Sequence, residues 1–307
     1  MKALVAAGYG PVEDATITDV PKPALEPGKL LVRVEAAGIC PIDVKLVTGV
    51  VREMMPVEHP MIVGVDAAGV VEAVGEGVSG YAPGDAIVGI AIPAGTIAEY
   101  TLMPPGPVAH RPADLSAPRA AALPNAMLTA AAIAEAMQPR ARQLVLGVGT
   151  AGAVGSFLLQ LLADTGVRVI STARPEDADR VRGLGAAEVI DYTSLDTITE
   201  ALRRYPDGFD AAVDLVNFGA GIATTASAVK PGGTVFSALG GPPEFDRGVT
   251  AEYLNAYQAL GQFQELVDRV AVGKLAVEVA GYPFAQAPRA LADFATRRTR
   301  KRVVVTM

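Results

Sequence analysis

The segment Leu146–Gly155, which reads LGVGTAGAVG, decides the fold of this chain of 307 residues. The apolar residues Leu144–Leu146 predict a buried strand, and Gly152–Ala163 predicts a helix. A glycine-rich turn between a strand and a helix is the setting of a dinucleotide-binding fingerprint. Small residues there let the backbone approach a pyrophosphate, and the helix N-terminus offers free N–H groups. A glycine-rich turn without a ligand is the alternative.

Strands and helices alternate strictly after this turn, and an alanine-rich helix over Ala120–Met137 precedes it. The expected strands are Val167–Ile170, Glu188–Ile190, Ala211–Val216 and Thr234–Ser237. The expected helices between them are Glu176–Leu184, Leu195–Arg204 and Gly221–Val229. This order predicts an α/β fold of the Rossmann type, a doubly wound parallel sheet covered by helices.

The residues after the second strand distinguish two cofactors. An NAD site places an acid there to hold the ribose 2′-hydroxyl, but this chain has Ser171, Thr172 and Arg174. The hydroxyls can donate hydrogen bonds and the guanidinium can pair with a 2′-phosphate, so the sequence favours NADP(H). A solvated Arg174 before a helix is the alternative. Glu176 and Asp177 are expected to be first-turn helix acids.

Residues 1–120 have a different composition, which is rich in Gly, Pro and Val. Short apolar runs such as Leu30–Val34 and Ala68–Val74 lie between turn signals, among them Pro27–Gly28 and Gly75. This spacing is typical of a compact antiparallel β domain or barrel. Because the chain exceeds the ~100–200 residues of one domain, two domains are expected.

Composition narrows the classes of function. Half of the residues are hydrophobic and only 19% are charged, which fits a sheet buried on both faces. The stretch Gln143–Ala163 contains no charged residue and is long enough to span a membrane. It stands, however, at the start of the alternating strands and helices, so no membrane segment is expected. A net charge of −7 argues against nucleic acid as the main partner. One cysteine excludes an internal disulfide, and no signal peptide is recognised, so a cytoplasmic protein is expected.

Ordered blocks occur along the whole chain, at residues 31–43, 59–69, 122–130, 149–155, 184–192, 230–233 and 302–305. Together they resemble the medium-chain dehydrogenase/reductase superfamily, specifically its zinc-independent quinone oxidoreductase branch. The resemblance implies a GroES-like, β-rich substrate domain over residues 1–121 and 258–307. It implies an NADPH-binding Rossmann domain over residues 122–257, with the active site in the cleft between the two.

Zinc-dependent members of this superfamily hold the metal with a Cys, a His and a second Cys. The corresponding places in this chain are Cys40, Val65 and Asn125, so one ligand of three remains, whereas a catalytic zinc needs about three. His59 and His110 stand elsewhere and are interpreted as surface or cleft residues. No metal is therefore expected.

The resemblance implies direct hydride transfer from NADPH to a quinone or an α,β-unsaturated carbonyl, followed by protonation of an oxygen. Water or a residue of the first block would supply the proton, and the candidates are Cys40, Asp43 and Lys45. Cys40 stands where relatives commonly have Asn, and a small apolar wall of the pocket is its alternative role. Capping or bracing of the loop is the alternative role of Asp43.

The resemblance also assigns Thr129 to the nicotinamide and Tyr192 to the adenosine end of the cofactor. The ends of the fourth and fifth strands lie where open α/β sheets bind ligands. The predicted cofactor-binding residues are Thr129, Gly149, Thr150, Ala151, Gly152, Ala153, Val154, Ser171, Thr172, Arg174, Tyr192, Val216, Asn217, Ala238, Leu239 and Gly240.

Residues 248–254 resemble the edge strand through which relatives pair, so a homodimer is expected.

Three hypotheses for function follow. The leading one is NADPH-dependent, zinc-independent reduction of a quinone or enone. An enoyl-thioester reductase, or a tailoring reductase of a biosynthetic pathway, is a close alternative. A non-catalytic nucleotide-binding protein serving as a structural or RNA-interaction module is an alternative of another class, since a fold does not prove activity.

Overall fold

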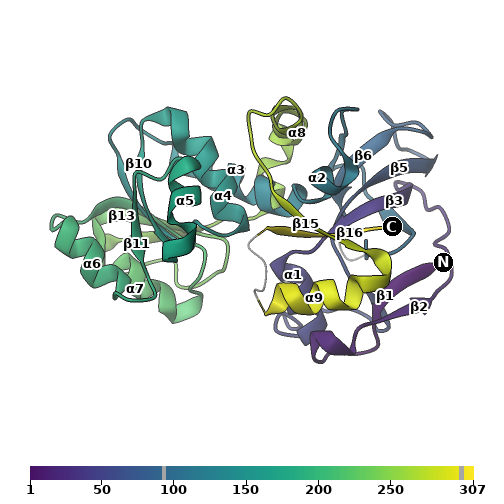
Figure 1. The fold of residues 1–307 in the computed structure, drawn as a ribbon, viewed down its shortest axis with the longest axis horizontal. Helices are drawn as coiled ribbons and strands as arrows, with labels where there is room; N and C mark the ends of the chain where they lie inside the picture. Colours follow the sequence, from purple (N-terminus) through teal and green to yellow (C-terminus); the bar gives the residue numbers. More distant parts are fainter. Residues whose placement is uncertain (92–94, 297–300) are drawn as a thin grey trace. The chain divides into compact units, whose positions relative to one another are not determined.

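The computed structural model describes residues 1–91, 95–296 and 301–307. The chain divides into two compact units, one made of Met1–Asn125 with Leu260–Met307 and the other of Ala126–Ala259. Both ends of the chain therefore belong to the first unit (Figure 1). The sequence predicts divisions after residue 121 and after residue 257, which stay a prediction.

The first unit is rich in antiparallel strands, as its short apolar runs and turn signals predict. Its main sheet has the order β15-β16-β3-β5-β6-β8, and β7 pairs with β3 as well. These strands are β3 (Leu30–Gly38), β5 (Asp66–Val74), β6 (Ala86–Ile90), β7 (Tyr100–Met103), β8 (Val108–His110), β15 (Val279–Pro283) and β16 (Arg302–Thr306). A smaller sheet contains β1 (Lys2–Ala6), β2 (Thr16–Asp19) and β4 (Met61–Ile62).

The C-terminal segment completes this unit. β16 pairs antiparallel with β3 and parallel with β15, and its residues Val303–Val305 are fully buried. The helices of the unit are α1 (Pro41–Thr48), α2 (Ala117–Ala121), α8 (Phe263–Ala271) and α9 (Ala287–Ala295). The expected β-rich domain is confirmed.

The second unit contains a parallel sheet of order β11-β10-β9-β12-β13-β14, which confirms the predicted doubly wound arrangement. Its strands are β9 (Leu144–Val148), β10 (Arg168–Ala173), β11 (Glu188–Asp191), β12 (Phe209–Asp214), β13 (Val229–Ser237) and β14 (Thr250–Tyr253). The chain runs outward from β9 to β11 and then returns to the other side of β9 at β12. The carboxyl end of β9 is therefore the topological switch point, where open α/β sheets bind ligands.

Helices cover this sheet and close its core. They are α3 (Pro124–Met137), α4 (Ala153–Leu162), α5 (Ala178–Gly183), α6 (Thr197–Arg204) and α7 (Ile222–Ala226) (Figure 1). Leu146, Ile170 and Phe209 have no exposed surface, and they pack in one cluster with Ile222 of α7. The strands are apolar on both faces because helices bury both.

Some predicted elements end elsewhere, for local reasons. The helix expected over Ala120–Met137 is two helices, because Pro124 disfavours helical backbone in the residue before it and begins α3 instead. The strand expected to reach Val216 ends at Asp214. The helix expected over Gly221–Val229 stops at Ala226, and Val229 already belongs to β13.

The uncharged stretch Gln143–Ala163 is divided among β9, the glycine-rich turn and α4. Among the helices that the described residues form, none combines the length and the apolar character needed to span a bilayer.

β14 lies at the edge of the parallel sheet, where a homodimer contact is predicted. The outer side of this strand already meets the chain's own segment 243–245. Ala251 N donates to Pro243 O at 2.8 Å, and Phe245 N donates to Val249 O at 2.8 Å. Any pairing between copies would therefore use the remaining part of β14, toward Tyr253.

Candidate active site

The glycine-rich turn adopts a conformation that depends on two of its glycines. Gly149 has φ +79°, a backbone region that favours glycine. A Cβ at Gly155 would lie 2.2 Å from Thr150 Cα and 2.5 Å from Thr150 O. Gly155 therefore lets α4 pack closely against the turn itself.

The amide groups at the start of α4 are available to a ligand. The helix begins after Gly152, so the N–H groups of Ala153 and Val154 have no acceptor within the helix. They lie at the positive end of the helix dipole, next to the switch point of the sheet. This arrangement fits a pyrophosphate, because it offers N–H donors and small side chains in one place.

The hydroxyl groups near the turn hold its shape. Thr150 Oγ1 donates to Gly147 O at 3.1 Å and is hydrogen-bonded to Ser171 Oγ, while Gly149 N donates to Thr172 Oγ1 at 3.0 Å. Ser171 is fully buried and Thr172 is 3% exposed. Both hydroxyls therefore bind the turn to β10. The sequence predicts that they bind the cofactor directly, whereas these hydrogen bonds give them a role in shaping the turn that would hold it.

Arg174 and Tyr192 meet at the carboxyl edge of the sheet, after β10 and β11. Arg174 Nε donates to Tyr192 Oη at 3.1 Å, and both side chains are exposed. This hydrogen bond raises the pKa of Arg174 above its ordinary value. The structure thus brings together a permanent cation and an aromatic ring, two groups suited to a phosphate and an adenine.

Arg180 of α5 is a contributor that the sequence analysis missed. Its Nη2 donates to Ala151 O at 2.9 Å and lies 3.4 Å from Asp177 Oδ1. Asp177 is 7% exposed, so it is a partner of Arg180 rather than only a first-turn helix acid. The pair fixes α5 against the glycine-rich turn.

Asp214, at the end of β12, organises the next loop and was also missed. Its buried carboxylate accepts hydrogen bonds from Val216 N and Asn217 N, both at 2.9 Å. It also accepts from Asn217 Nδ2 at 2.9 Å and from the hydroxyl of Thr225. An acid that ends a buried apolar strand is a signal for such a role, since a buried charge requires partners.

The loops after β12 and β13 are tied to one another. Gly219 N donates to Gly240 O at 2.9 Å, and Leu239 N donates to Ser237 Oγ at 3.1 Å. Val216 also reaches the glycine-rich turn, because its Cγ2 lies 2.6 Å from the position of a Cβ on Gly149. The predicted residues Val216, Asn217, Ala238, Leu239 and Gly240 therefore lie in two joined loops at the ligand-binding edge.

Phe218, in the first of these loops, is 74% exposed, although aromatic side chains usually bury much of their surface. The sequence offered no pattern that would single out this residue. An exposed ring at the carboxyl edge of a parallel sheet is a candidate contact for a planar ligand.

The predicted catalytic residues Cys40 and Asp43 form the N-terminal cap of α1. Asp43 Oδ2 accepts from Cys40 N at 2.7 Å, and the Cys40 side chain faces the Asp43 N–H in return. Each is 1% exposed. Asp43 thus has the capping role that was its alternative, and the buried thiol matches the alternative of an apolar wall. Lys45 lies further along α1 and is partly exposed.

Burial governs the titration of this cap. It raises the pKa of Asp43 to about 7, against the opposing effect of the hydrogen bonds from Cys40 and of the Arg302 guanidinium. Burial, with the nearby carboxyls of Asp43 and Asp66, raises the pKa of the Cys40 thiol well above its ordinary value. Cys40 is therefore a neutral thiol at physiological pH, unsuited to nucleophilic attack.

Thr129, predicted to face the nicotinamide, is 4% exposed in α3. It lies one helical turn after Asn125, whose N–H points to the carboxylate of Asp66 at 3.2 and 3.3 Å. Asp66 directly follows Val65, the place of a zinc ligand in metal-dependent relatives.

The two histidines are engaged in ring contacts. His59 meets Tyr9 edge to face with 4.5 Å between ring centroids, and His110 stacks on Tyr81 at 4.9 Å. Over the described parts of the chain, residues 1–91, 95–296 and 301–307, no group of three or more His, Cys, Asp or Glu side chains could hold a metal ion.

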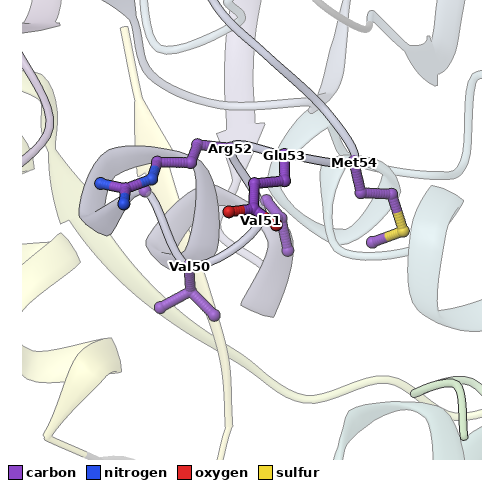
Figure 2. Close-up of a pocket in the computed structure, with 6 residues that line it drawn as sticks. Val50, Val51, Arg52, Glu53 and Met54 are labelled. Atoms are coloured by element: carbon purple, nitrogen blue, oxygen red, sulfur yellow. The ribbon is translucent and has the colours of Figure 1, made fainter.

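A hollow of about 400 Å³ lies beside the loop Gly49–Met54, which follows α1 (Figure 2). Val50 and Met54 are 73% and 75% exposed, and Figure 2 shows the side chains of Arg52 and Met54 extending in opposite directions. The Tyr9 hydroxyl accepts from Val57 N at 3.3 Å, so the far end of this loop is braced. The loop presents apolar side chains next to the helix that carries the predicted catalytic residues.

Two family models match this chain. The model described as an alcohol dehydrogenase GroES-like domain matches residues 26–113, and the model described as a zinc-binding dehydrogenase matches residues 184–305.

Individual proteins are similar over longer stretches. A chloroplastic quinone-oxidoreductase homolog of Spinacia oleracea is 35% identical over 62% of this chain, and the match spans only 61% of that relative's length. An NADPH-dependent alkenal/one oxidoreductase of Arabidopsis thaliana, also chloroplastic, is 30% identical over 99% of this chain and 79% of its own. The solved structure of a quinone oxidoreductase from Coxiella burnetii superposes with a TM-score of 0.90, at 27% identity, covering 100% of this chain and 99% of the other.

Proposed function

The chain belongs to the medium-chain dehydrogenase/reductase superfamily, in its quinone oxidoreductase-like branch, and on that premise we propose that it is an NADPH-dependent oxidoreductase. Its substrate would be a quinone or an α,β-unsaturated carbonyl, reduced without zinc. The observation that carries the proposal is the glycine-rich turn, whose free helix amides lie at the switch point of a parallel sheet.

NADPH is favoured over NADH by the edge of the sheet after β10. Arg174 provides a permanent cation there, held by Tyr192, and the strand end Ile170–Arg174 contains no acid to bind a ribose 2′-hydroxyl. The similar Arabidopsis protein is an NADPH-dependent alkenal/one oxidoreductase, which supports the same choice.

The chain's own residues would bind and orient the cofactor. The amides of α4 would hold the pyrophosphate, Arg174 the 2′-phosphate, and Thr129 would contact the nicotinamide. When bound, the reduced nicotinamide supplies a hydride to an electron-poor carbon of the substrate. Lys45, whose side chain is partly exposed, would then protonate the substrate oxygen directly or through water. Cys40 and Asp43 would shape the site through the cap of α1.

Zinc independence is proposed from the residues present at the ligand places. Val65 has no donor atom and Asn125 stands in place of the second Cys, so Cys40 is one ligand where a catalytic zinc needs about three. The exposed apolar side chains of Val50 and Met54 would favour a substrate with an apolar body.

A direct assay tests the function. Purified protein is mixed with NADPH and, separately, with quinones, enones and enoyl thioesters, and the absorbance of the reduced nicotinamide is followed. Turnover with quinones or enones, unaffected by a chelator, is the expected result. Turnover confined to enoyl thioesters would instead assign the thioester reductase. Binding of NADPH with no turnover on any acceptor would identify a non-catalytic nucleotide-binding protein.

Replacing Arg174 by alanine is expected to weaken NADPH binding by about tenfold or more, because a charge-assisted contact to phosphate contributes ~1.5–3 kcal/mol. NADH has no 2′-phosphate, so its affinity should change less than about twofold. Titration of reduced nicotinamide fluorescence measures both values. Arg182→Ala is a matched control, since it removes an arginine of α5 that pairs with Asp179 at 2.9 Å. Equal weakening of NADPH and NADH would contradict the role of Arg174.

We also propose a homodimer that uses the edge of β14. Light scattering at micromolar protein is expected to give twice the 31.5 kDa of the chain. Because the segment 243–245 occupies part of this edge, the contact would depend on the remaining strand and on side chains around it. A monomeric mass at these concentrations would refute the dimer.

A further inference from the structure

A pair of buried charges holds the short segment Ala122–Asn125, where the chain passes from α2 to α3 and leaves the first unit. Arg302 Nε donates to Ala122 O at 3.0 Å. At the other end of the segment, Asn125 N donates to the Asp66 carboxylate at 3.2 and 3.3 Å. Residues from β5 and β16, far apart in sequence, thus bind both ends of one connection.

Arg302 and Asp66 are also paired with each other. Arg302 Nη2 lies 3.8 Å from Asp66 Oδ2, and the side chains are 7% and 0% exposed. Arg302 Nη1 and Nη2 are buried and make no hydrogen bond, so the guanidinium is anchored by its Nε alone and by charge. A buried ion pair with unfilled hydrogen bonds is a poor source of stability, because desolvation offsets much of its attraction. A positional role accounts better for its presence.

The surroundings leave the segment little freedom. A Cβ on Gly38 of β3 would lie 2.2 Å from Ala121 O, so the end of α2 is already pressed against the sheet. Beyond the segment, Asp66 acts as a distant cap on the first turn of α3, at the positive end of its dipole. Thr129 follows Asn125 by one turn on the same face of this helix.

We propose that Asp66 and Arg302 form a clamp on Ala122–Asn125 and are positioning residues, which act on the reaction through the placement of α3 and Thr129. The role of Thr129 rests on the proposed function; the clamp itself does not. The titratable or charged groups that face Asp66 are Cys40 and Asp43 of α1 and Arg302 of β16.

The first test measures hydrogen exchange and needs no activity. In Asp66→Asn, amides of residues 122–130 should exchange at least tenfold faster than in the wild type at the same pH, while amides of β9 and β12 change less than twofold. Glu35→Gln is the matched control: it breaks another ion pair of the first unit, with Arg111 at 2.6 Å, that does not contact the segment. Uniform acceleration, or none in residues 122–130, would overturn the clamp. If Asp66→Asn does not fold, Arg302→Lys keeps the charge and is expected to show the same local pattern.

The second test separates positioning from simple stability. In Asp66→Asn, kcat should fall about tenfold with the KM for NADPH within threefold, because a displaced nicotinamide contact acts on the reacting geometry. The double variant Asp66→Asn/Arg302→Met removes the unpaired charge and should regain stability while kcat stays low. Recovery of kcat together with stability would overturn the positioning role. Absence of NADPH turnover in the wild type would refute the proposed function instead, leaving the exchange test of the clamp intact.

Discussion

A Gly155→Ala variant is expected to lose about 3 kcal/mol of stability or more, together with NADPH binding. The added Cβ would lie 2.2 Å from Thr150 Cα, 2.5 Å from its O and 2.6 Å from its C, all of them backbone atoms. Backbone cannot give way as a flexible side chain can, so α4 must move from the turn or the turn must distort. Overpacking of this kind costs ~1–3 kcal/mol in ordinary cores and more where backbone is involved.

Gly183→Ala is the matched control for this experiment. Gly183 is also a helical glycine of the second unit, but a Cβ there meets nothing within 4 Å. Alanine at that place should be neutral or stabilise by up to about 1 kcal/mol. Urea unfolding compares the variants, and reduced nicotinamide fluorescence measures binding. A Gly155→Ala protein within about 0.5 kcal/mol of the wild type would show that the close approach is not required.

The stability of the first unit is expected to fall as the pH rises from 5 to 8, by a total on the order of 3 kcal/mol. Burial raises the pKa of Asp43 to about 7, from an ordinary value of 3.8. Below about pH 7 this carboxyl therefore holds a proton in the folded protein and releases it on unfolding. Each proton released lowers stability by up to about 1.4 kcal/mol per pH unit.

Hydrogen exchange of the β3 amides, corrected for the intrinsic rate at each pH, gives the opening free energy of this unit. Asp43→Asn should flatten its pH dependence, whereas Asp19→Asn, at a surface pair with Lys2, should leave it unchanged. The pKa of Glu200 in the second unit is lowered to about 2 by hydrogen bonds from Arg203 and Arg204, so its opposite effect lies below about pH 4.5. Stability of β3 that stays level or rises between pH 5 and 8 would rule out the raised pKa of Asp43.

The parallel sheet and its glycine-rich turn could be predicted from sequence because both are local patterns. Apolar runs, small residues and helix periodicity occur within a few residues of one another, and each restricts the backbone directly. The break in the predicted helix at Pro124 was also visible in principle, since proline constrains the residue before it. The end of β12 was harder to predict, because the strand stops at the buried Asp214 although the apolar residues Leu215 and Val216 follow it.

The supporting groups of the candidate site were harder to predict for a physical reason. The partners of Asp66 are Arg302 and Asn125, and no local pattern connects residues that far apart in a chain. Arg180 and Asp214 likewise act through contacts made only after folding. Their one signal is a charge within or beside a buried segment, which shows that a partner exists but not which residue it is. Ser171 and Thr172 show a different limit. The sequence placed both residues beside the cofactor turn, but it could not show that their hydroxyls form hydrogen bonds with the turn itself.

Cys40 provides a built-in reporter of the first unit. It is the single cysteine of the chain, it is 1% exposed, and its thiol is held in the cap of α1. A thiol reagent in solution can therefore modify the native chain at one place, and only when the start of α1 opens. The rate of that single modification measures the opening of the helix without an introduced label, in the presence or absence of any ligand.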